Sequence, residues 1–152
     1  MKISVVIPVF NEEKYVKKII DKVSSINIEK EIIVVDDGSS DNSLSIIENI
    51  NIQNLKIIKN EKNYGKGYSI KEALKHVKNN IIIIQDADLE YDPNDYFKLL
   101  EPFRRKDVFV VYGSRFLGIK RIILNKGLNY NFRAIVNLFL TFLFNIINNQ
   151  RI

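Results

Sequence analysis

The sequence predicts an α/β domain in which a doubly wound, mostly parallel β-sheet is covered by helices on both faces. Five short runs rich in β-branched residues alternate with amphipathic stretches. The runs are Ile3–Val9, Glu31–Asp36, Leu55–Lys59, Ile81–Gln85 and Val108–Tyr112. They are nearly continuous in Ile and Val instead of alternating with polar residues, which is typical of parallel strands buried on both sides.

The stretches between these runs carry the signals of helices. After the first run, one helical face is marked by four apolar residues, namely Val16, Ile19, Ile20 and Val23. Ser40 or Asp41 offers a cap for the next helix, and Asp92 followed by Pro93 does so for a later one. We expect residues 1–117 to form one folded domain.

The chain of 152 residues is long enough for a single core and contains no cysteine. This excludes a disulfide framework and a thiolate metal site, so a metal ion would need oxygen ligands or the single histidine. That residue, His76, is expected to be solvated at the surface. The N-terminal segment lacks the features of a signal peptide, so a cytoplasmic location is expected.

Positive charge is concentrated at the C-terminal end. Residues 1–107 contain 17 Lys and Arg against 18 Asp and Glu, whereas residues 108–152 contain six basic and no acidic residues. A near-neutral body with a cationic, apolar end favours an anionic surface such as a membrane over a nucleic acid. We expect residues 118–152 to form an amphipathic helical tail.

Acidic and amide side chains follow three of the predicted strands. They are Asn11–Glu12, Asp36–Asp37 and Asp86–Ala87–Asp88. Because ligands of open parallel sheets bind at the carboxyl ends of the strands, these residues define the predicted site. We expect Asp37 to be solvent-accessible there and to accept a hydrogen bond from a nucleobase or ribose. Asp41 is equally well explained as a helix cap.

Asp86 and Asp88 are difficult to explain as structural residues. Two carboxylates two positions apart at the end of an apolar strand repel each other unless a cation lies beside them. Their oxygen atoms suit Mg²⁺ or Mn²⁺, which bind through one or two carboxylates and the phosphates of a substrate. The sequence therefore predicts a divalent metal site.

The segment Asn63–Gly67 opens a predicted helix. Its amides and Lys66 are placed to face a phosphate, although a plain glycine-rich turn explains the segment equally well. The spacing is not that of a P-loop, and no GxGxxG follows the first strand. ATPase and ordinary dehydrogenase functions are thereby disfavoured.

Five motifs follow one another in a characteristic order, namely ISVVIPVFNEE, EIIVVDDGSSDNS, KNYGKG, IIIIQDADLEYDP and VYGSRF. Together they resemble the family 2 glycosyltransferases with the GT-A fold, over roughly residues 1–147. The resemblance is strongest to dolichol-phosphate mannose synthases and bacterial undecaprenyl-phosphate sugar transferases.

This resemblance implies a nucleotide site and a metal site. The nucleotide site would comprise Pro8, Phe10, Asn11, Glu12, Asp36, Asp37, Lys66, Asp86 and Ala87. Asp86 and Asp88 match the DxD motif, whose second aspartate binds the metal, and Glu90 takes the place of a residue that can join it. Arg115 matches an arginine that approaches phosphate, so the implied catalytic residues are Asp86, Asp88 and Arg115.

The reaction implied by the resemblance is a metal-dependent, inverting sugar transfer. The donor would be a nucleoside diphosphate sugar of the GDP-mannose or UDP-glucose type, and the acceptor a polyprenyl phosphate. A phosphate acceptor is largely ionised at neutral pH and does not need the general base that a hydroxyl needs. Relatives continue past the segment aligned with residues 148–152 into acceptor-site residues, so we expect a shortened chain.

Three alternative functions remain open from the sequence. A haloacid-dehalogenase-type phosphatase also has DxD after an apolar strand, although usually the first one, and Leu89–Glu90 does not fit its pattern. A receiver-like module would have a lysine where Ser114–Arg115 follows the last run. A donor-binding fragment without full activity fits the same motifs.

The C-terminal segment has polar residues at a four-residue step, namely Arg133, Asn137, Thr141 and Asn145. On a helix they form one stripe, and the apolar remainder is shorter than the roughly 20 residues that span a bilayer. We expect an interfacial helix at the inner face of the membrane. The basic residues facing anionic headgroups would be Lys120, Arg121, Lys126 and Arg133. Packing on the sheet or homodimerisation through this helix is the alternative.

Overall fold

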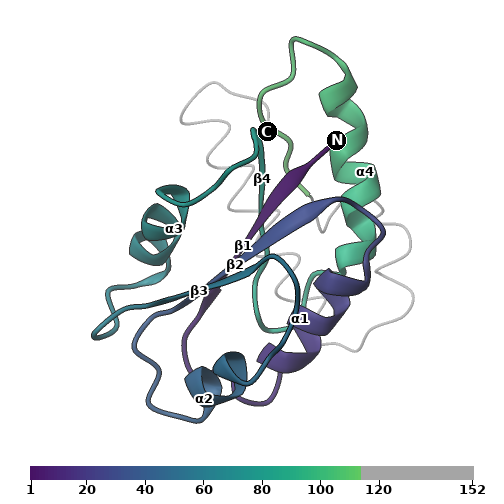
Figure 1. Cartoon of the computed structure of the whole chain (residues 1–152). Coiled ribbons are helices and arrows are strands. Elements are labelled where there is room, and N and C mark those ends of the chain that lie inside the picture. Colours follow the sequence, from purple (N-terminus) through teal and green to yellow (C-terminus); the bar gives the residue numbers. More distant parts are fainter. Residues whose placement is uncertain (114–152) are drawn as a thin grey trace, which may run out of the picture. The chain divides into compact units, whose positions relative to one another are not determined.

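The computed structural model describes residues 1–113, of which Met1–Val108 form one compact unit. Its centre is a sheet of four parallel strands in the order β3-β2-β1-β4 (Figure 1). The strands are β1 (Ile3–Val9), β2 (Lys30–Asp36), β3 (Leu55–Lys59) and β4 (Ile81–Ile84). Parallel neighbours require crossover connections, so every loop that leaves a strand starts at the same end of the sheet.

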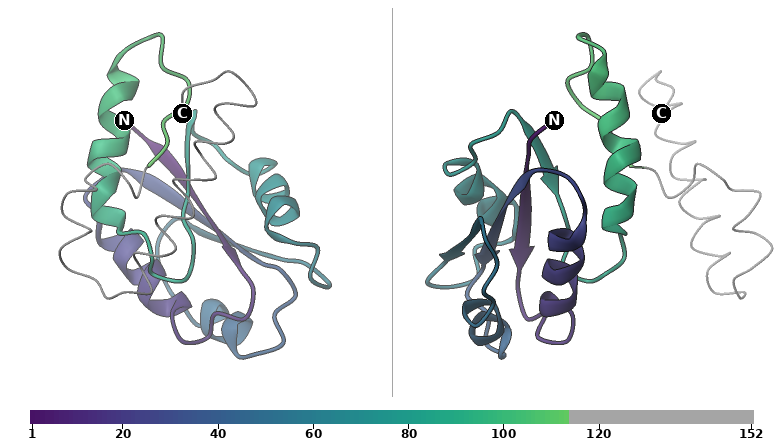
Figure 2. Two further views of the ribbon diagram at one scale, coloured as in Figure 1. Left: turned by 180° about the vertical axis from the view of Figure 1, so that it is seen from behind. Right: turned by 45° about the vertical axis from the view of Figure 1, so that its right-hand side comes forward.

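Helices cover both faces of the sheet, and the first three of them make these crossovers. They are α1 (Val16–Ser25), α2 (Ser43–Glu48), α3 (Lys66–Leu74) and α4 (Tyr96–Leu100), with short 3₁₀ turns at Pro93–Asp95 and Glu101–Arg104. Two views of the molecule show α3 on one side of the sheet and α1 with α4 on the other (Figures 1 and 2). The predicted α/β arrangement with helices on both faces is confirmed.

Two apolar cores result from this layering. The larger core joins alternate residues of β1 and β2 to the apolar stripe of α1 and to Ile47 of α2. The smaller one joins Val6, Ile33 and Val35 to Ala73 of α3. All four predicted stripe residues of α1 are fully buried. Each buried Val or Ile contributes about 1.5–3 kcal/mol, which explains why both faces of the central strands are apolar.

The strand register brings the carboxyl ends of three strands close together. Val5 of β1 lies opposite Ile32 of β2 on one side and Ile83 of β4 on the other. β1 and β2 end level with each other, because Val9 lies opposite Asp36, whereas β4 ends earlier, opposite Val6. The residues after β4 therefore continue along the end of β1. The cleft described below lies at this end of the sheet.

The structure differs from the sequence prediction at its C-terminal side. No strand forms at Val108–Tyr112, because β-branched and aromatic composition does not by itself supply a pairing strand. The predicted boundary at residue 117 and the predicted tail lie outside the described residues. Within residues 1–113, none of the helices combines the length and apolarity that crossing a bilayer requires.

Gly38 occupies the turn after β2, where a side chain does not fit. Its φ is +69°, in the left-handed region. A Cβ atom there would lie 2.5 Å from the Cα and carbonyl carbon of Lys62 and 2.9 Å from the amide nitrogen of Asn63. The turn after β2 and the loop before α3 therefore approach each other through backbone alone.

Gly38→Ala is expected to lower the free energy of unfolding by about 2–4 kcal/mol, since it combines a left-handed alanine with a clash against backbone. Gly67→Ala is the matched control, because a Cβ at Gly67 would meet no atom within 4 Å. The control should be neutral or stabilising by up to about 1 kcal/mol. Urea unfolding of both variants checks this, and equal stability of the two would contradict the proposed backbone contact.

Candidate functional site

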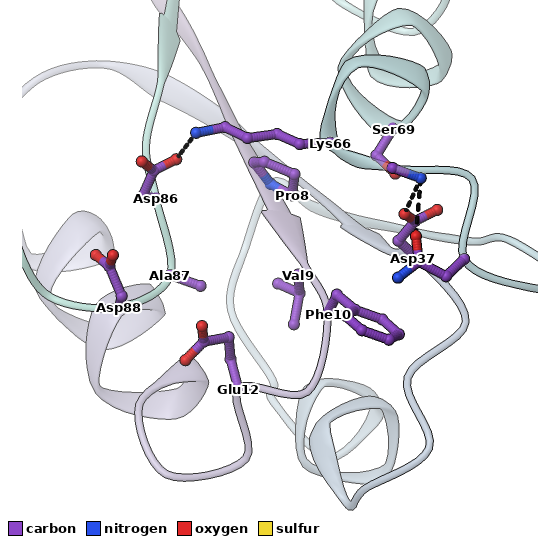
Figure 3. Close-up of a pocket in the computed structure, with 12 residues that line it drawn as sticks. Pro8, Val9, Phe10, Glu12, Asp37, Lys66, Ser69, Asp86, Ala87 and Asp88 are labelled. Carbon is purple, nitrogen blue, oxygen red and sulfur yellow. Dashed lines mark hydrogen bonds and ion pairs between the residues drawn. The ribbon is translucent and has the colours of Figure 1, made fainter.

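A cleft of about 350 Å³ opens at the carboxyl ends of β1, β2 and β4, beside the start of α3 (Figure 3). Its lining residues are Pro8, Val9, Phe10, Glu12, Asp37, Asn63, Gly65, Lys66, Ser69, Asp86, Ala87 and Asp88. Eight of these were predicted as site residues from the sequence: Pro8, Phe10, Glu12, Asp37, Lys66, Asp86, Ala87 and Asp88. The structure thus brings together residues from four separate segments of the chain.

The loop after β1 is tied to the loop after β2. The side-chain oxygen of Asn11 accepts a hydrogen bond from the Ser40 amide at 2.8 Å, and the Glu12 amide donates to the hydroxyl of Ser43 at 2.8 Å. Asn11 also has a left-handed φ of 55°. Asn11 was predicted to bind nucleotide, but it does not line the cleft, because its side chain is bonded to the neighbouring loop.

Asp41 belongs to the same pair of loops and has a structural role. Its carboxylate accepts hydrogen bonds from the amides of Ser43 at 2.9 Å and Glu13 at 3.1 Å. Burial alone would raise the pKa of Asp41, but the hydrogen bonds from Ser43 and Glu13 outweigh it and lower the pKa. Of the two explanations that fitted Asp41, the structural one agrees with this geometry, because Asp41 bonds the amide of the first residue of α2, although the N-cap residue itself is Asn42.

Asp37 is buried, and the expectation that it is solvent-accessible was wrong. The residue is only 3% exposed. The carboxylate accepts hydrogen bonds from the side-chain amide of Asn60 at 2.6 Å and from the main-chain amides of Tyr64 at 3.1 Å and Gly65 at 2.7 Å. Burial alone would raise the pKa of Asp37, yet these bonds lower it. Asp37 therefore fixes the loop that leads into α3.

Asp36 was also predicted to bind nucleotide, but it does not line the cleft. The residue is 1% exposed, and one carboxylate oxygen accepts a hydrogen bond from the Ser39 amide at 3.1 Å. The other oxygen has no hydrogen-bond partner among the described residues. Asp36, the last residue of β2, is therefore a buried residue of the strand and not a residue of the cleft lining.

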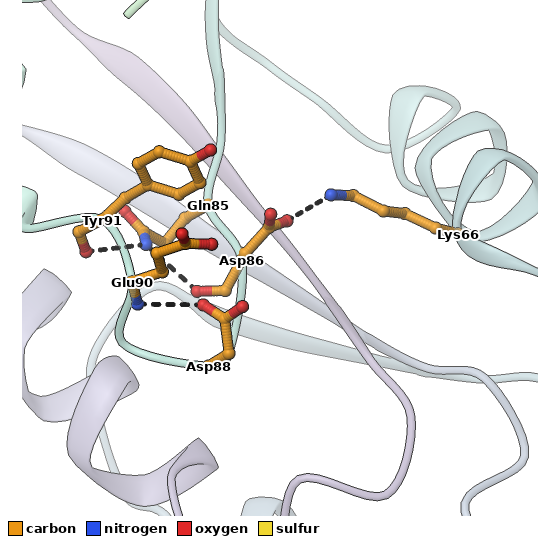
Figure 4. Close-up of polar contacts among 6 residues, drawn as sticks. All are labelled: Lys66, Gln85, Asp86, Asp88, Glu90 and Tyr91. Carbon is orange, nitrogen blue, oxygen red and sulfur yellow. Dashed lines mark hydrogen bonds and ion pairs between the residues drawn. The ribbon is translucent and has the colours of Figure 1, made fainter. Parts of the chain in front are cut away.

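The turn after β4 presents Asp86 and Asp88 on the opposite side of the cleft (Figures 3 and 4). Asp86 forms an ion pair with Lys66, which reaches across from the first residue of α3. One oxygen of Asp88 accepts a hydrogen bond from the Glu90 amide at 2.9 Å. The predicted glycine-rich helix start and the predicted acidic pair therefore face each other.

Two buried residues that were not predicted from the sequence support this turn. The side-chain amide of Gln85 donates to the carbonyl oxygens of Asp86 at 3.0 Å and Tyr91 at 3.2 Å, so it bridges both ends of the turn. The hydroxyl of Tyr96, in α4, donates to the side-chain oxygen of Gln85 at 2.8 Å. Burial raises the pKa of Tyr96, so its hydroxyl stays protonated and remains a donor. The sequence signal that could have identified Gln85 is its position as a polar residue directly after four isoleucines.

The donor set of this cleft fits a divalent cation that is shared with a ligand. Glu12, Asp86 and Asp88 all line the cleft. Burial raises the pKa of Glu12, and the charges of Asp88 and Asp41 raise it further. Within residues 1–113, no three His, Asp or Glu side chains are grouped to hold a metal ion by themselves. Two carboxylates with additional phosphate oxygens are the usual arrangement for Mg²⁺. Glu90 as a third ligand remains a prediction, and Arg115 lies outside the described residues.

The architecture and the cleft together define an α/β domain with a polar cleft at the carboxyl ends of a parallel sheet, and comparison with known proteins gives its family. Residues 4–147 match glycosyl transferase family 2, so the chain belongs to this family. An uncharacterized protein of Methanocaldococcus jannaschii, MJ0544, is 33% identical over 138 residues, and the match covers 86% of this chain and 58% of that protein. The family membership excludes the phosphatase and receiver alternatives.

Solved structures share the fold. The mannosyltransferase PcManGT from Pyrobaculum calidifontis, in complex with GDP-Man and Mn²⁺, has a TM-score of 0.53 and 26% identity over 57% of this chain and 27% of its own. S. aureus TarS 1-349 has a TM-score of 0.61 and 28% identity, and the match covers 77% of this chain and 40% of that protein. A third structure is glucosyl-3-phosphoglycerate synthase from Mycobacterium tuberculosis in complex with Mn²⁺, UDP and glucosyl-3-phosphoglycerate. It has a TM-score of 0.57 and 26% identity, and the match covers 67% of this chain and 39% of that protein.

These likenesses confirm the predicted GT-A fold. The chain spans 58% of the length of MJ0544 and 27% to 40% of the three solved proteins. What the solved proteins bind is therefore considered for this chain only as a proposal.

Asp37→Ala is expected to lower the free energy of unfolding by about 2–4 kcal/mol at neutral pH, because it leaves buried donors of Asn60 and Gly65 unpaired. Because the folded-state pKa of Asp37 is lowered, its contribution is complete above the ordinary value of 3.8 and is lost as the pH falls through the folded value. The stability difference between native and variant chains should narrow accordingly in acid.

Asp21→Ala is the control for this prediction, since Asp21 is half-exposed and, within residues 1–113, forms its ion pair with Lys17 one helical turn away. Its effect should stay within about 0.5 kcal/mol. Denaturant titrations across pH measure both variants. If Asp37→Ala proved no more destabilising than Asp21→Ala, the anchoring role of Asp37 would be refuted.

Proposed function

We propose that this chain is the donor-binding domain of a metal-dependent glycosyltransferase. The proposal depends mainly on one observation: Asp86, Asp88 and Lys66 converge on a single cleft at the carboxyl ends of a parallel sheet. The solved proteins with the same fold support it, because two of them are complexes that contain Mn²⁺ with GDP-Man or with UDP.

The cleft offers different chemistry to each part of a nucleoside diphosphate sugar. Phe10 is 42% exposed at the end of β1 and presents an apolar face to a nucleobase. Asp86 and Asp88 would hold Mg²⁺ or Mn²⁺ against the diphosphate, and Lys66 adds the positive charge of its ammonium group. A GDP-mannose or UDP-glucose type of donor fits this division.

The proposed reaction is inverting transfer of the sugar to an acceptor. When bound, the divalent cation supplies charge stabilisation for the departing diphosphate. This chain's own residues orient the donor: the loop fixed by Asp37 positions Lys66, and the Gln85–Tyr96 pair positions the two aspartates. Orientation of this kind lowers the barrier by preparing the donor for attack.

We further propose a polyprenyl phosphate as the acceptor, at the inner, cytoplasmic face of a membrane. The six basic residues of 108–152, with no acidic residue, support an anionic lipid surface as the partner. A phosphate acceptor is already ionised near neutral pH, so the cleft does not have to supply a general base. A dolichol-phosphate or undecaprenyl-phosphate sugar transferase would combine these properties.

Asp88→Asn is expected to weaken Mn²⁺-dependent binding of GDP or UDP at least about tenfold, which corresponds to about 1.4 kcal/mol. The substituted amide keeps an oxygen for the Glu90 amide, so the turn is preserved while the ligand charge is lost. Isothermal titration with Mn²⁺ and with EDTA measures the effect. Asp21→Asn, on the exposed side of α1, is the control and should bind like the native chain.

Equal nucleotide affinity in Mn²⁺ and in EDTA would refute the metal role. Binding of nucleotide and Mn²⁺ without transfer or hydrolysis of any donor sugar would favour the alternative of a donor-binding fragment.

A membrane test concerns the basic residues of the tail. Replacing Lys120, Arg121 and Lys126 by Ala should abolish sedimentation with anionic vesicles at low salt, since each contributes about 1 kcal/mol near such a surface. The control variant replaces Lys17, Lys18 and Lys71 by Ala, which removes the same net charge from residues 1–107. Loss of binding in both variants, or a stable dimer of the native chain that ignores vesicles, would contradict the membrane proposal.

A further inference from the structure

Lys66 is the only cation among the residues that line the cleft in the described part of the chain. Three carboxylates, those of Glu12, Asp86 and Asp88, lie on the lining opposite or beside it, and a fourth, Asp37, is saturated by hydrogen bonds beneath the loop. An anionic diphosphate would be repelled by such a lining unless cations accompany it. The partner of Lys66 therefore determines how well the cleft accommodates an anionic donor.

The lysine is paired with one specific carboxylate, that of Asp86 (Figures 3 and 4). The Asp88 carboxylate has no ion pair among the described residues and accepts one main-chain hydrogen bond. Without metal or donor, Lys66 therefore provides the charge compensation that a divalent cation would give to Asp86. A divalent cation and an ammonium group cannot both lie against the same carboxylate without strong repulsion between them.

The ion pair is suited to exchange. The Lys66 side chain is 56% exposed and that of Asp86 28% exposed, so water screens their attraction and little energy is needed to separate them. The lysine backbone, in contrast, is fixed: Gly65, the residue before it, donates its amide to both Asp37 and Asn63. Only the flexible four-carbon stem has to move, and an ammonium group binds phosphate as a point charge in many orientations.

We propose that Lys66 is an exchangeable counterion that couples metal binding to donor binding. In the empty cleft it neutralises Asp86. When a divalent cation and a diphosphate arrive together, Lys66 leaves Asp86 to the cation and pairs with the diphosphate. A cation that binds without nucleotide has to displace Lys66 and gives it no new partner, whereas a bound diphosphate provides one. Metal and nucleotide therefore each raise the affinity of the chain for the other. This inference rests on the proposed function and adds a residue-level cause of cooperativity to it.

The test compares Lys66→Met with Lys71→Met. Both remove one positive charge from α3, but Lys71 is exposed near the end of the helix and does not line the cleft. Electron paramagnetic resonance measures Mn²⁺ affinity without nucleotide, and isothermal titration measures GDP and UDP affinity in saturating Mn²⁺. Lys66→Met should bind Mn²⁺ alone more tightly, bind nucleotide more weakly, and lose a coupling factor of about fivefold or more.

Lys71→Met should retain the native coupling, and Lys66→Arg, which keeps the charge, should restore most of it. Unchanged Mn²⁺ affinity in Lys66→Met would overturn the exchange, as would tighter Mn²⁺ binding with undiminished nucleotide affinity. These results are distinct from failure of the proposed function. If the native chain shows no cooperativity between Mn²⁺ and either nucleotide, the proposed function fails and the exchange with it, whereas native cooperativity that persists in Lys66→Met overturns the exchange alone.

Discussion

The geometry of the cleft depends on the buried carboxylate of Asp37. It connects the end of β2 to Asn60, directly after β3, and to the amides of Tyr64 and Gly65 before α3. A charged group at 3% exposure is tolerated only when it is fully hydrogen-bonded, and these donors in turn would be costly to bury without it. These hydrogen bonds therefore hold the loop in place, and the loop in turn fixes the backbone of Lys66 at the start of α3.

Hydrogen-bond saturation separates the acidic residues at this end of the sheet into two groups. Asp37 and Asp41 accept several hydrogen bonds, mostly from main-chain amides of the loops around them, and these bonds lower the pKa of each. Asp86, in contrast, has a lysine as its partner, and Asp88 accepts one amide. Carboxylate oxygens that are already occupied by main-chain donors are poor candidates for binding a cation. The unsaturated pair after β4 is therefore the better site for chemistry.

The sequence predicts the strands and helices well because their signals are local. Four of the five β-branched runs are strands, and the apolar stripe of α1 is buried as its spacing requires. The fifth run fails because a strand needs a partner, which composition does not provide. The cleft was predicted by the rule for parallel sheets, and eight of the predicted residues line it.

The roles of individual aspartates were harder to predict. Asp37 and Asp86 each follow an apolar strand and look alike in the sequence. They differ through partners far along the chain: the donors to Asp37 lie 23 to 28 residues away, and Lys66 lies 20 residues from Asp86. Gln85 and Tyr96 are also hard to recognise in the sequence, because their role depends on the hydrogen bond between them, which forms only in the folded chain.

The turn after β4 combines several unfavourable features, and the layers beneath it explain how it persists. Leu89 has a left-handed φ of 64°, which is costly for a residue with a branched side chain, and the turn also carries three like charges, those of Asp86, Asp88 and Glu90. Leu89 packs on the larger core, and Gln85 with Tyr96 holds both ends of the turn through neutral, buried hydrogen bonds. Because these bonds carry no charge, neither salt nor a change of pH near neutrality alters them. The contact that can change is the exposed ion pair of Asp86 with Lys66, so adjustment is confined to the one place where a charged ligand would enter.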